Sequence, residues 1–324
     1  MHPAFSIIFL TTLIGAGQGL FLALYSGQLY SVLNLLPDES PSFYVIGSML
    51  VMVLLVAGLM SSFFHLGRPE RAWRSAVRWR TSWMSREVIV LPAFMGSVVA
   101  WGLIHYLGWN PVLFSVSKNI SVDVSLLVGA VATLLCFTLF LCTGMIYACL
   151  KMLQEWASPL TVINYTLLGG SSGFILATVF AAWQNSGMSG FFGGWSVVLT
   201  LLAFLTRAAS LYRNARLKHK SSLQTAIGIR HTDIQQTAQG AMGGSFNTRE
   251  YFHGASKRKY KSVKWAFLVL AFPLPLLLLS FGLGSHVMEL LVAAFLMQYI
   301  GLLMERWFFF AQANHPQNLY YQTV

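Results

Sequence analysis

Eight long apolar stretches divide this chain, more than the core of any water-soluble fold of this length could hold. They span roughly residues 5–35, 42–64, 87–107, 122–150, 160–183, 191–213, 264–284 and 286–310. A helix needs about 20 apolar residues to cross the hydrocarbon core of a bilayer. Of the 324 residues, 56% are hydrophobic and only 10% are charged. The sequence therefore predicts an all-α integral membrane protein, a bundle of eight transmembrane helices forming a single membrane domain over 1–324.

The seventh stretch contains Pro273 and Pro275. Proline cannot donate a backbone hydrogen bond, and its ring clashes with the preceding turn of a helix. We therefore expect a kink in this span.

Basic residues are distributed unevenly between the two ends of the predicted bundle. Eight spans place both termini on one side, together with the loops after spans two, four and six. All Lys and Arg residues except Lys118 fall on that side. The positive-inside rule makes this side cytoplasmic. The net charge of +11 is thus a signal of topology, and we expect no nucleic-acid partner. Two basic cytoplasmic loops stand out, at 65–87 and at 214–262.

The first of these loops joins a histidine to a carboxylate. Span two is expected to end at His65, because Gly67 and Pro69 break the helix. Ser85 is well placed to cap span three, which puts Glu87 in its first turn. The loop would then return Glu87 to the membrane depth of His65.

Histidine, carboxylate and arginine at a membrane surface could bind a quinone headgroup, which needs hydrogen-bond donors and a proton-exchanging group. The candidate binding and proton-transfer residues in this stretch are His65, Arg68, Arg71, Arg74, Trp83 and Glu87, with Arg78, Arg80 and Arg86 as candidate docking residues for a partner. The alternative is that the arginines only determine topology and that the tryptophans are ordinary interfacial residues.

Polar residues inside other spans are further candidates. Gln18 shares a helical face with Gly15 and Gly19, and it could bond across packed helices or line a headgroup cavity. Glu305 and Arg306 in the last span are intramembrane charges, which are functional candidates by default. Being adjacent in sequence, they are expected to pair with other groups and not with each other.

Metal binding has little support in the sequence. The three cysteines, Cys136, Cys142 and Cys149, form no CxxC motif and are expected to be packing residues. His105 and His286, both near the non-cytoplasmic side, could serve as axial haem ligands, but plain interfacial histidines are the simpler interpretation.

The segment His65-Leu66-Gly67-Arg68-Pro69-x-Arg71-Ala72, followed by Ser85-x-Glu87, resembles the membrane-anchor subunits of the dimethyl sulfoxide reductase family. The resemblance implies eight transmembrane helices in the bacterial inner membrane and quinone, either ubiquinone or menaquinone, bound near His65 and Glu87. It also implies two partners, an iron–sulfur electron-transfer subunit and a molybdopterin catalytic subunit, and these hold the metal cofactors.

The extended form HLGRPERAW followed by RTSWMSRE is most similar to the anchors of membrane-bound, quinone-linked sulfite dehydrogenases, whose partners face the cytoplasm. We therefore expect a subunit that passes electrons between a docked iron–sulfur protein and the quinone pool during sulfite oxidation to sulfate. Two alternatives are the anchor of a reductase that oxidises menaquinol and, from another class, a secondary transporter. Against the transporter, no paired interrupted spans are evident.

Overall fold

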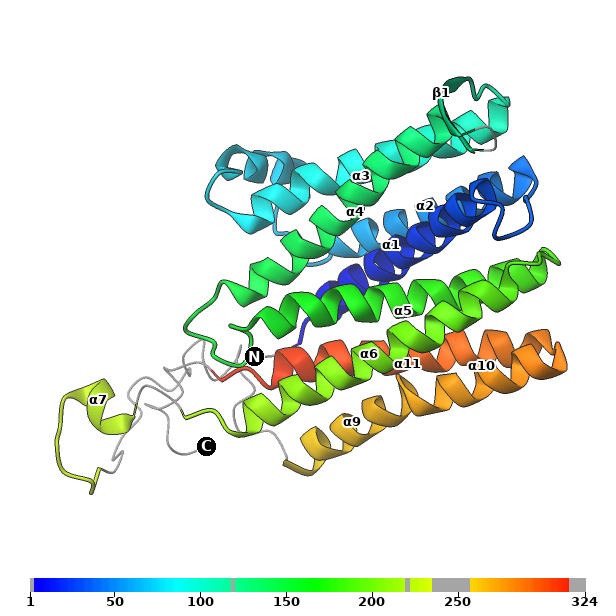
Figure 1. Ribbon diagram of the computed structural model, residues 1–324. Helices are drawn as coiled ribbons and strands as arrows, with labels where there is room; N and C mark the ends of the chain where they lie inside the picture. The colour runs from blue at the N-terminus through cyan, green and yellow to red at the C-terminus, as the bar shows by residue number, and fades with distance from the viewer. Residues whose placement is uncertain (1–2, 118–119, 219–221, 235–256, 315–324) are drawn as a thin grey trace.

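The computed structural model describes residues 3–117, 120–218, 222–234 and 257–314 (Figure 1). It confirms eight helical segments that are long and apolar enough to cross a membrane. These are α1 (Phe5–Val32), α2 (Pro41–Ser62), α3 (Trp83–Leu107), α4 (Val124–Ala148), α5 (Pro159–Trp183), α6 (Ser189–Ala215), the pair α9 (Lys257–Leu270) and α10 (Pro273–Ser285), and α11 (Met288–Ala311).

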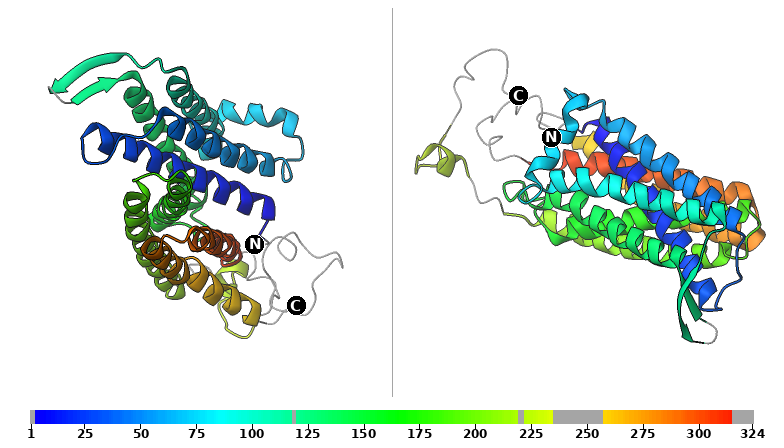
Figure 2. Two further views of the ribbon diagram at one scale, coloured as in Figure 1. Left: turned by 90° about the vertical axis from the view of Figure 1, so that its right-hand side faces the viewer. Right: turned by 90° about the horizontal axis from the view of Figure 1, so that it is seen from above.

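Helices α1 and α5 form the centre of the bundle. Seen along the helices, α2 and α3 lie on one side of α1, and α6, α9 and α11 lie on the other (Figure 2). The α1–α5 crossing is close enough to require glycine, because a Cβ added at Gly19 would clash with the carbonyl oxygen of Gly169. Small residues commonly let membrane helices approach in this way. The crossing fixes the position of the part of α1 that carries Gln18.

The seventh span is interrupted, as its prolines predict. Helix α9 ends at Leu270, a turn occupies Ala271 and Phe272, and α10 begins at Pro273. A proline at 275 leaves the carbonyl of Ala271 without its usual helical donor. The side-chain amide of Gln298, on α11, donates to that carbonyl at 3.5 Å. The broken span is thus supported by its neighbour.

Two short elements in the connections were not predicted. A 3₁₀ helix, η1 (Pro69–Arg78), lies inside the 65–87 loop, and a two-stranded hairpin, β1 (Val112–Ser117) and β2 (Ile120–Asp123), joins α3 to α4. The expected cap was also wrong, since Ser82 and not Ser85 caps α3, accepting from the backbone N–H of Ser85. Glu87 consequently lies in the second turn of α3.

One end of the bundle gathers the elements that the sequence assigns to the basic side. The start of α1, the end of α11, η1 and α7 (Leu223–Ile227) all lie at this end, opposite the hairpin (Figure 1). Much of the 214–262 loop, residues 219–221 and 235–256, lies outside the described residues. We call this end of the bundle the η1 end.

Candidate functional site

A cleft opens inside the η1-end half of the bundle, between five helices. Its cavity volume is about 30 Å³, so a ring-sized ligand would enter only as the lining side chains move apart. Helices α1, α3, α4, α5 and α11 contribute its lining, which consists of Leu10, Thr11, Thr12, Ile14, Gly15, Gln18, Glu87, Phe140, Thr143, Tyr165, Leu168, Gly169, Ser172, Leu302 and Arg306. We call this space the interior cleft. It combines apolar walls with a few polar groups, the usual make-up of a small-molecule site.

Glu87 is the one carboxylate among the described residues that line the cleft. The hydroxyl of Thr143, on α4, donates a hydrogen bond to Glu87 Oε1. This contact fixes a carboxylate on α3 against the neighbouring helix. A carboxylate inside a membrane span is costly unless it is paired or functional, and here a neutral hydroxyl is its hydrogen-bonding partner.

Gln18 bonds across packed helices, as one interpretation of its sequence context predicts, and it also lines the interior cleft. Its side-chain amide donates to the backbone carbonyl of Cys136, on α4, at 2.9 Å. The amide is therefore held in place by the α1–α4 contact while facing the same space as Glu87. Two of the predicted candidates, Gln18 and Glu87, are brought together by the fold.

The cleft has a second polar wall that sequence reasoning missed. Arg306, on α11, lies over the ring of Tyr165, on α5, with 4.0 Å between its guanidinium carbon and the ring centroid. Both residues line the cleft and are at least nine-tenths buried. The Tyr165 hydroxyl and Arg306 Nη1 have no hydrogen-bond partner among the described residues. The two groups lie close enough to interact with each other, and the Tyr165 hydroxyl also lies close to Tyr147, but neither atom makes a well-formed hydrogen bond that would prevent it from binding a ligand.

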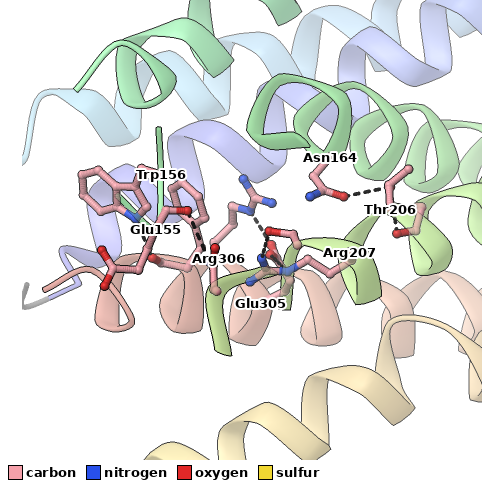
Figure 3. A network of polar contacts seen from close by, with 11 residues as sticks. Glu155, Trp156, Asn164, Thr206, Arg207, Glu305 and Arg306 are labelled. Carbon is pink, nitrogen blue, oxygen red and sulfur yellow. Dashed lines mark hydrogen bonds and ion pairs between the residues drawn. The ribbon is translucent and has the colours of Figure 1, made fainter. Parts of the chain in front are cut away.

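Arg306 is held by an ionic cluster within the membrane-spanning region. Glu305 Oε2 lies 2.5 Å from Arg306 Nε, and Glu305 Oε1 lies 2.7 Å from Arg207 Nε, on α6 (Figure 3). The expectation that the adjacent Glu305 and Arg306 do not pair is therefore wrong. Both side chains are long enough to meet, and the Glu305 carboxylate binds Arg306 with one oxygen and Arg207 with the other. Arg207 and Arg306, moreover, are buried in the bundle and are not part of the basic surface.

His65 lies apart from the cleft. It follows the end of α2, its side chain is exposed, and no residue of α2 lines the interior cleft. The chain covers part of the imidazole, and this partial burial lowers the pKa of His65 below its ordinary value. The fold thus separates His65 from Glu87, although both belong to the η1-end half of the molecule.

The other predicted residues of the 65–87 segment form an external surface. The side chains of Arg68, Arg71, Arg74, Arg78 and Arg80 are exposed. Arg86 instead bonds the backbone carbonyls of Trp79 and Arg80 and lies 4.1 Å over the ring of Trp83. None of these residues lines the interior cleft. We call the five exposed arginines the arginine face.

The histidines considered for haem are not arranged as a pair. His105, on α3, stacks on Tyr44 and lies 3.5 Å from the side-chain nitrogen of Gln28. His286 is the left-handed cap of α10, which packs against α6, α9 and α11. In the part of the chain that the structure describes, no group of three or more His, Cys, Asp or Glu side chains could hold a metal ion.

Comparison with known proteins identifies the family. The family profile described as "DMSO reductase anchor subunit (DmsC)" matches residues 1–312. The chain is also 56% identical, over the full length of both proteins, to a protein of Allochromatium vinosum that is named as a subunit of sulfite dehydrogenase. The chain belongs to the DMSO reductase anchor subunit family.

Proposed function

We propose that this protein is the quinone-reactive membrane anchor of an oxidoreductase complex that oxidises sulfite to sulfate. Electrons pass from a docked iron–sulfur subunit to quinone, and the sulfite site is on a molybdopterin subunit. The observation that carries the proposal is the placement of Glu87 and Gln18 together in the interior cleft, at the same end of the bundle as the arginine face.

The chemistry of the cleft suits a quinone headgroup. Reduction of a quinone to a quinol consumes two electrons and two protons, so the site needs hydrogen-bonding groups and a proton donor. Glu87 is the proton-exchanging group, and Thr143 orients its carboxylate. The apolar side chains of Leu10, Ile14 and Phe140 line the cleft and would contact the ring of a bound quinone. His65, exposed near the η1 end, exchanges protons between water and this region.

The arginine face is the docking surface in this proposal. Five exposed guanidinium groups on and around η1 would attract an acidic partner surface, and electrostatic complementarity favours rapid and specific association. Their excess on one side also places this face in the cytoplasm by the positive-inside rule. The inner membrane of a bacterium is the location that fits such a complex.

Sulfite is favoured as substrate by the name of the full-length relative, which is a sulfite dehydrogenase subunit. The family as a whole takes its name from dimethyl sulfoxide reductase. The same cleft would serve electron flow in either direction, because quinone and quinol present the same oxygen atoms to it.

The test compares two electron acceptors in membranes that contain the assembled complex. Decylubiquinone requires the anchor, whereas ferricyanide accepts electrons directly from the soluble subunits. We expect Glu87→Gln to lower sulfite-dependent decylubiquinone turnover at least about tenfold, since a general acid or base typically contributes roughly 10²–10⁴-fold, and to leave ferricyanide turnover unchanged. The matched control is Glu289→Gln, an exposed carboxylate at the opposite end of α11. Normal quinone turnover in Glu87→Gln would refute the proposal.

A further inference from the structure

Tyr165 and Arg306 form a wall of the interior cleft in which buried polar atoms lack hydrogen bonds, as they would in a binding site without its ligand. Tyr165 is 6% exposed and Arg306 is 4% exposed. Buried hydroxyl and guanidinium groups are normally hydrogen-bonded, since each unsatisfied donor costs free energy. Here the Tyr165 hydroxyl and Arg306 Nη1 lack partners among the described residues, and both residues line the cleft.

The charge balance of the cluster points the same way. Glu305 is shared by two guanidinium groups, those of Arg207 and Arg306. Buried charges are normally compensated, yet one positive charge in this cluster has no carboxylate of its own. Glu155, a buried carboxylate nearby, forms no ion pair within the described ranges, and Figure 3 shows it apart from the two arginines. Glu305 and Arg207 would form a neutral pair by themselves. Arg306 therefore gives the cluster a net positive charge.

The position of Arg306 is fixed by several contacts. Its Nε atom bonds Glu305, and its planar group stacks on Tyr165 and lies 5.2 Å from the ring centroid of Phe309. A guanidinium held in this way has lost its rotational freedom before any ligand arrives, which lowers the entropic cost of binding. Its Nη1 group, which makes no hydrogen bond to a described residue, is available to an oxygen acceptor in the cleft.

From these observations we infer that Tyr165 and Arg306 form a two-donor clamp for a quinone carbonyl oxygen, with Glu305 as the positioning residue of Arg306. The inference rests on the proposed function and extends it. Glu87 and Thr143, from α3 and α4, would serve proton exchange, while Tyr165 and Arg306, from α5 and α11, would bind the oxygen and stabilise the negative charge that it gains on reduction.

The experiment measures substrate affinity in the purified complex. The Michaelis constant is determined with decylubiquinone, and binding is measured with 2-heptyl-4-hydroxyquinoline N-oxide, a headgroup analogue. Tyr165→Phe should raise the Michaelis constant about fivefold, the loss expected for one hydrogen bond. Arg306→Gln should raise it roughly tenfold or more, because charged donors bind more strongly, and Arg306→Lys should recover part of the loss. Both neutral variants should weaken binding of the analogue.

The matched control is Tyr25→Phe. Tyr25 is equally buried and donates to the carbonyl of Leu126, away from the interior cleft. Its loss should leave both affinities unchanged. Tyr165→Phe keeps the aromatic ring beneath the Arg306 guanidinium and removes only the hydroxyl, so it should assemble normally. It therefore decides the matter even where Arg306→Gln does not assemble.

Unchanged affinities in Tyr165→Phe, with Glu87→Gln still slow, would overturn the clamp and leave the proposed function standing. Unchanged quinone turnover in Glu87→Gln would instead refute the proposed function.

Discussion

The hydroxyl of Thr143, on α4, donates a hydrogen bond to the carboxylate of Glu87, on α3. This contact joins two neighbouring helices at the edge of the interior cleft and sets the direction of the carboxylate. It ties the proton-exchanging group of the proposed site to a residue that no sequence motif identifies.

Replacing Thr143 tests this positioning. Thr143→Val has nearly the same shape but no hydroxyl, so the Glu87 carboxylate loses its orientation and one hydrogen bond. We expect decylubiquinone turnover to fall about five- to tenfold, corresponding to roughly 1–1.4 kcal/mol of transition-state stabilisation, with ferricyanide turnover unchanged. Thr143→Ser restores the hydroxyl and should recover most of the activity. Equal activity of the valine and serine variants would show that the contact has no role in turnover.

The close crossing of α1 and α5 predicts a difference between two glycines. A Cβ at Gly19 would collide with the backbone at Gly169, whereas a Cβ at Gly194, on α6, would meet open space. Gly19→Ala should therefore destabilise the fold by about 1–3 kcal/mol through overpacking. Gly194→Ala should be neutral or stabilise it by about 0.5–1 kcal/mol. Thermal unfolding in detergent gives both values, and equal midpoints would contradict the crossing geometry.

The pKa of His65 predicts a pH dependence of quinone reduction. Partial burial lowers that pKa below its ordinary value, so the ring is mainly neutral at pH 7. If protons reach the cleft by way of protonated His65, turnover should increase as the pH falls from 8 and level off only below about 6.5, the ordinary value for histidine. His65→Gln should lower turnover and remove this increase. The ratio of decylubiquinone to ferricyanide turnover corrects for titration of the partner subunits, and the same pH profile in both proteins would exclude His65 from proton transfer.

The arginine face predicts salt-sensitive docking. Arg71 and Arg74 are exposed, so their attraction to a partner is screened as ionic strength rises. The double variant Arg71→Glu and Arg74→Glu should release the soluble subunits from washed membranes at a lower salt concentration than the wild type does. Immunoblotting of the wash measures this. Retention up to the wild-type salt concentration would place the docking surface elsewhere.

Much of the fold follows from simple sequence features. Apolar length alone identifies the eight spans, and Pro273 and Pro275 locate the break between α9 and α10. Gln18 and Glu87 were both predicted as candidates, and the fold brings them to one cleft. Apolar length and proline position are local features of the chain, and polar residues such as Gln18 and Glu87 are costly inside a membrane span. A single sequence reveals features of both kinds.

The other half of the cleft depends on contacts between distant segments. Arg207 and Glu305 meet through the packing of α5, α6 and α11, which apolar periodicity does not specify. The position of Glu87 along α3 was also mispredicted, since the cap at Ser82 starts α3 three residues earlier than a cap at Ser85 would. At 1.5 Å of rise per residue, Glu87 lies about 4–5 Å deeper in the bundle than expected.

The central claim is that the interior cleft binds the quinone headgroup. Its most direct test is photolabelling of the assembled complex with an azido-quinone, followed by peptide mapping. The account predicts labels on Glu87 or on the lining segments 10–18, 140–143, 165–172 or 302–306, with labelling prevented by excess decylubiquinone. Labels that decylubiquinone suppresses only on segments outside this lining would contradict it.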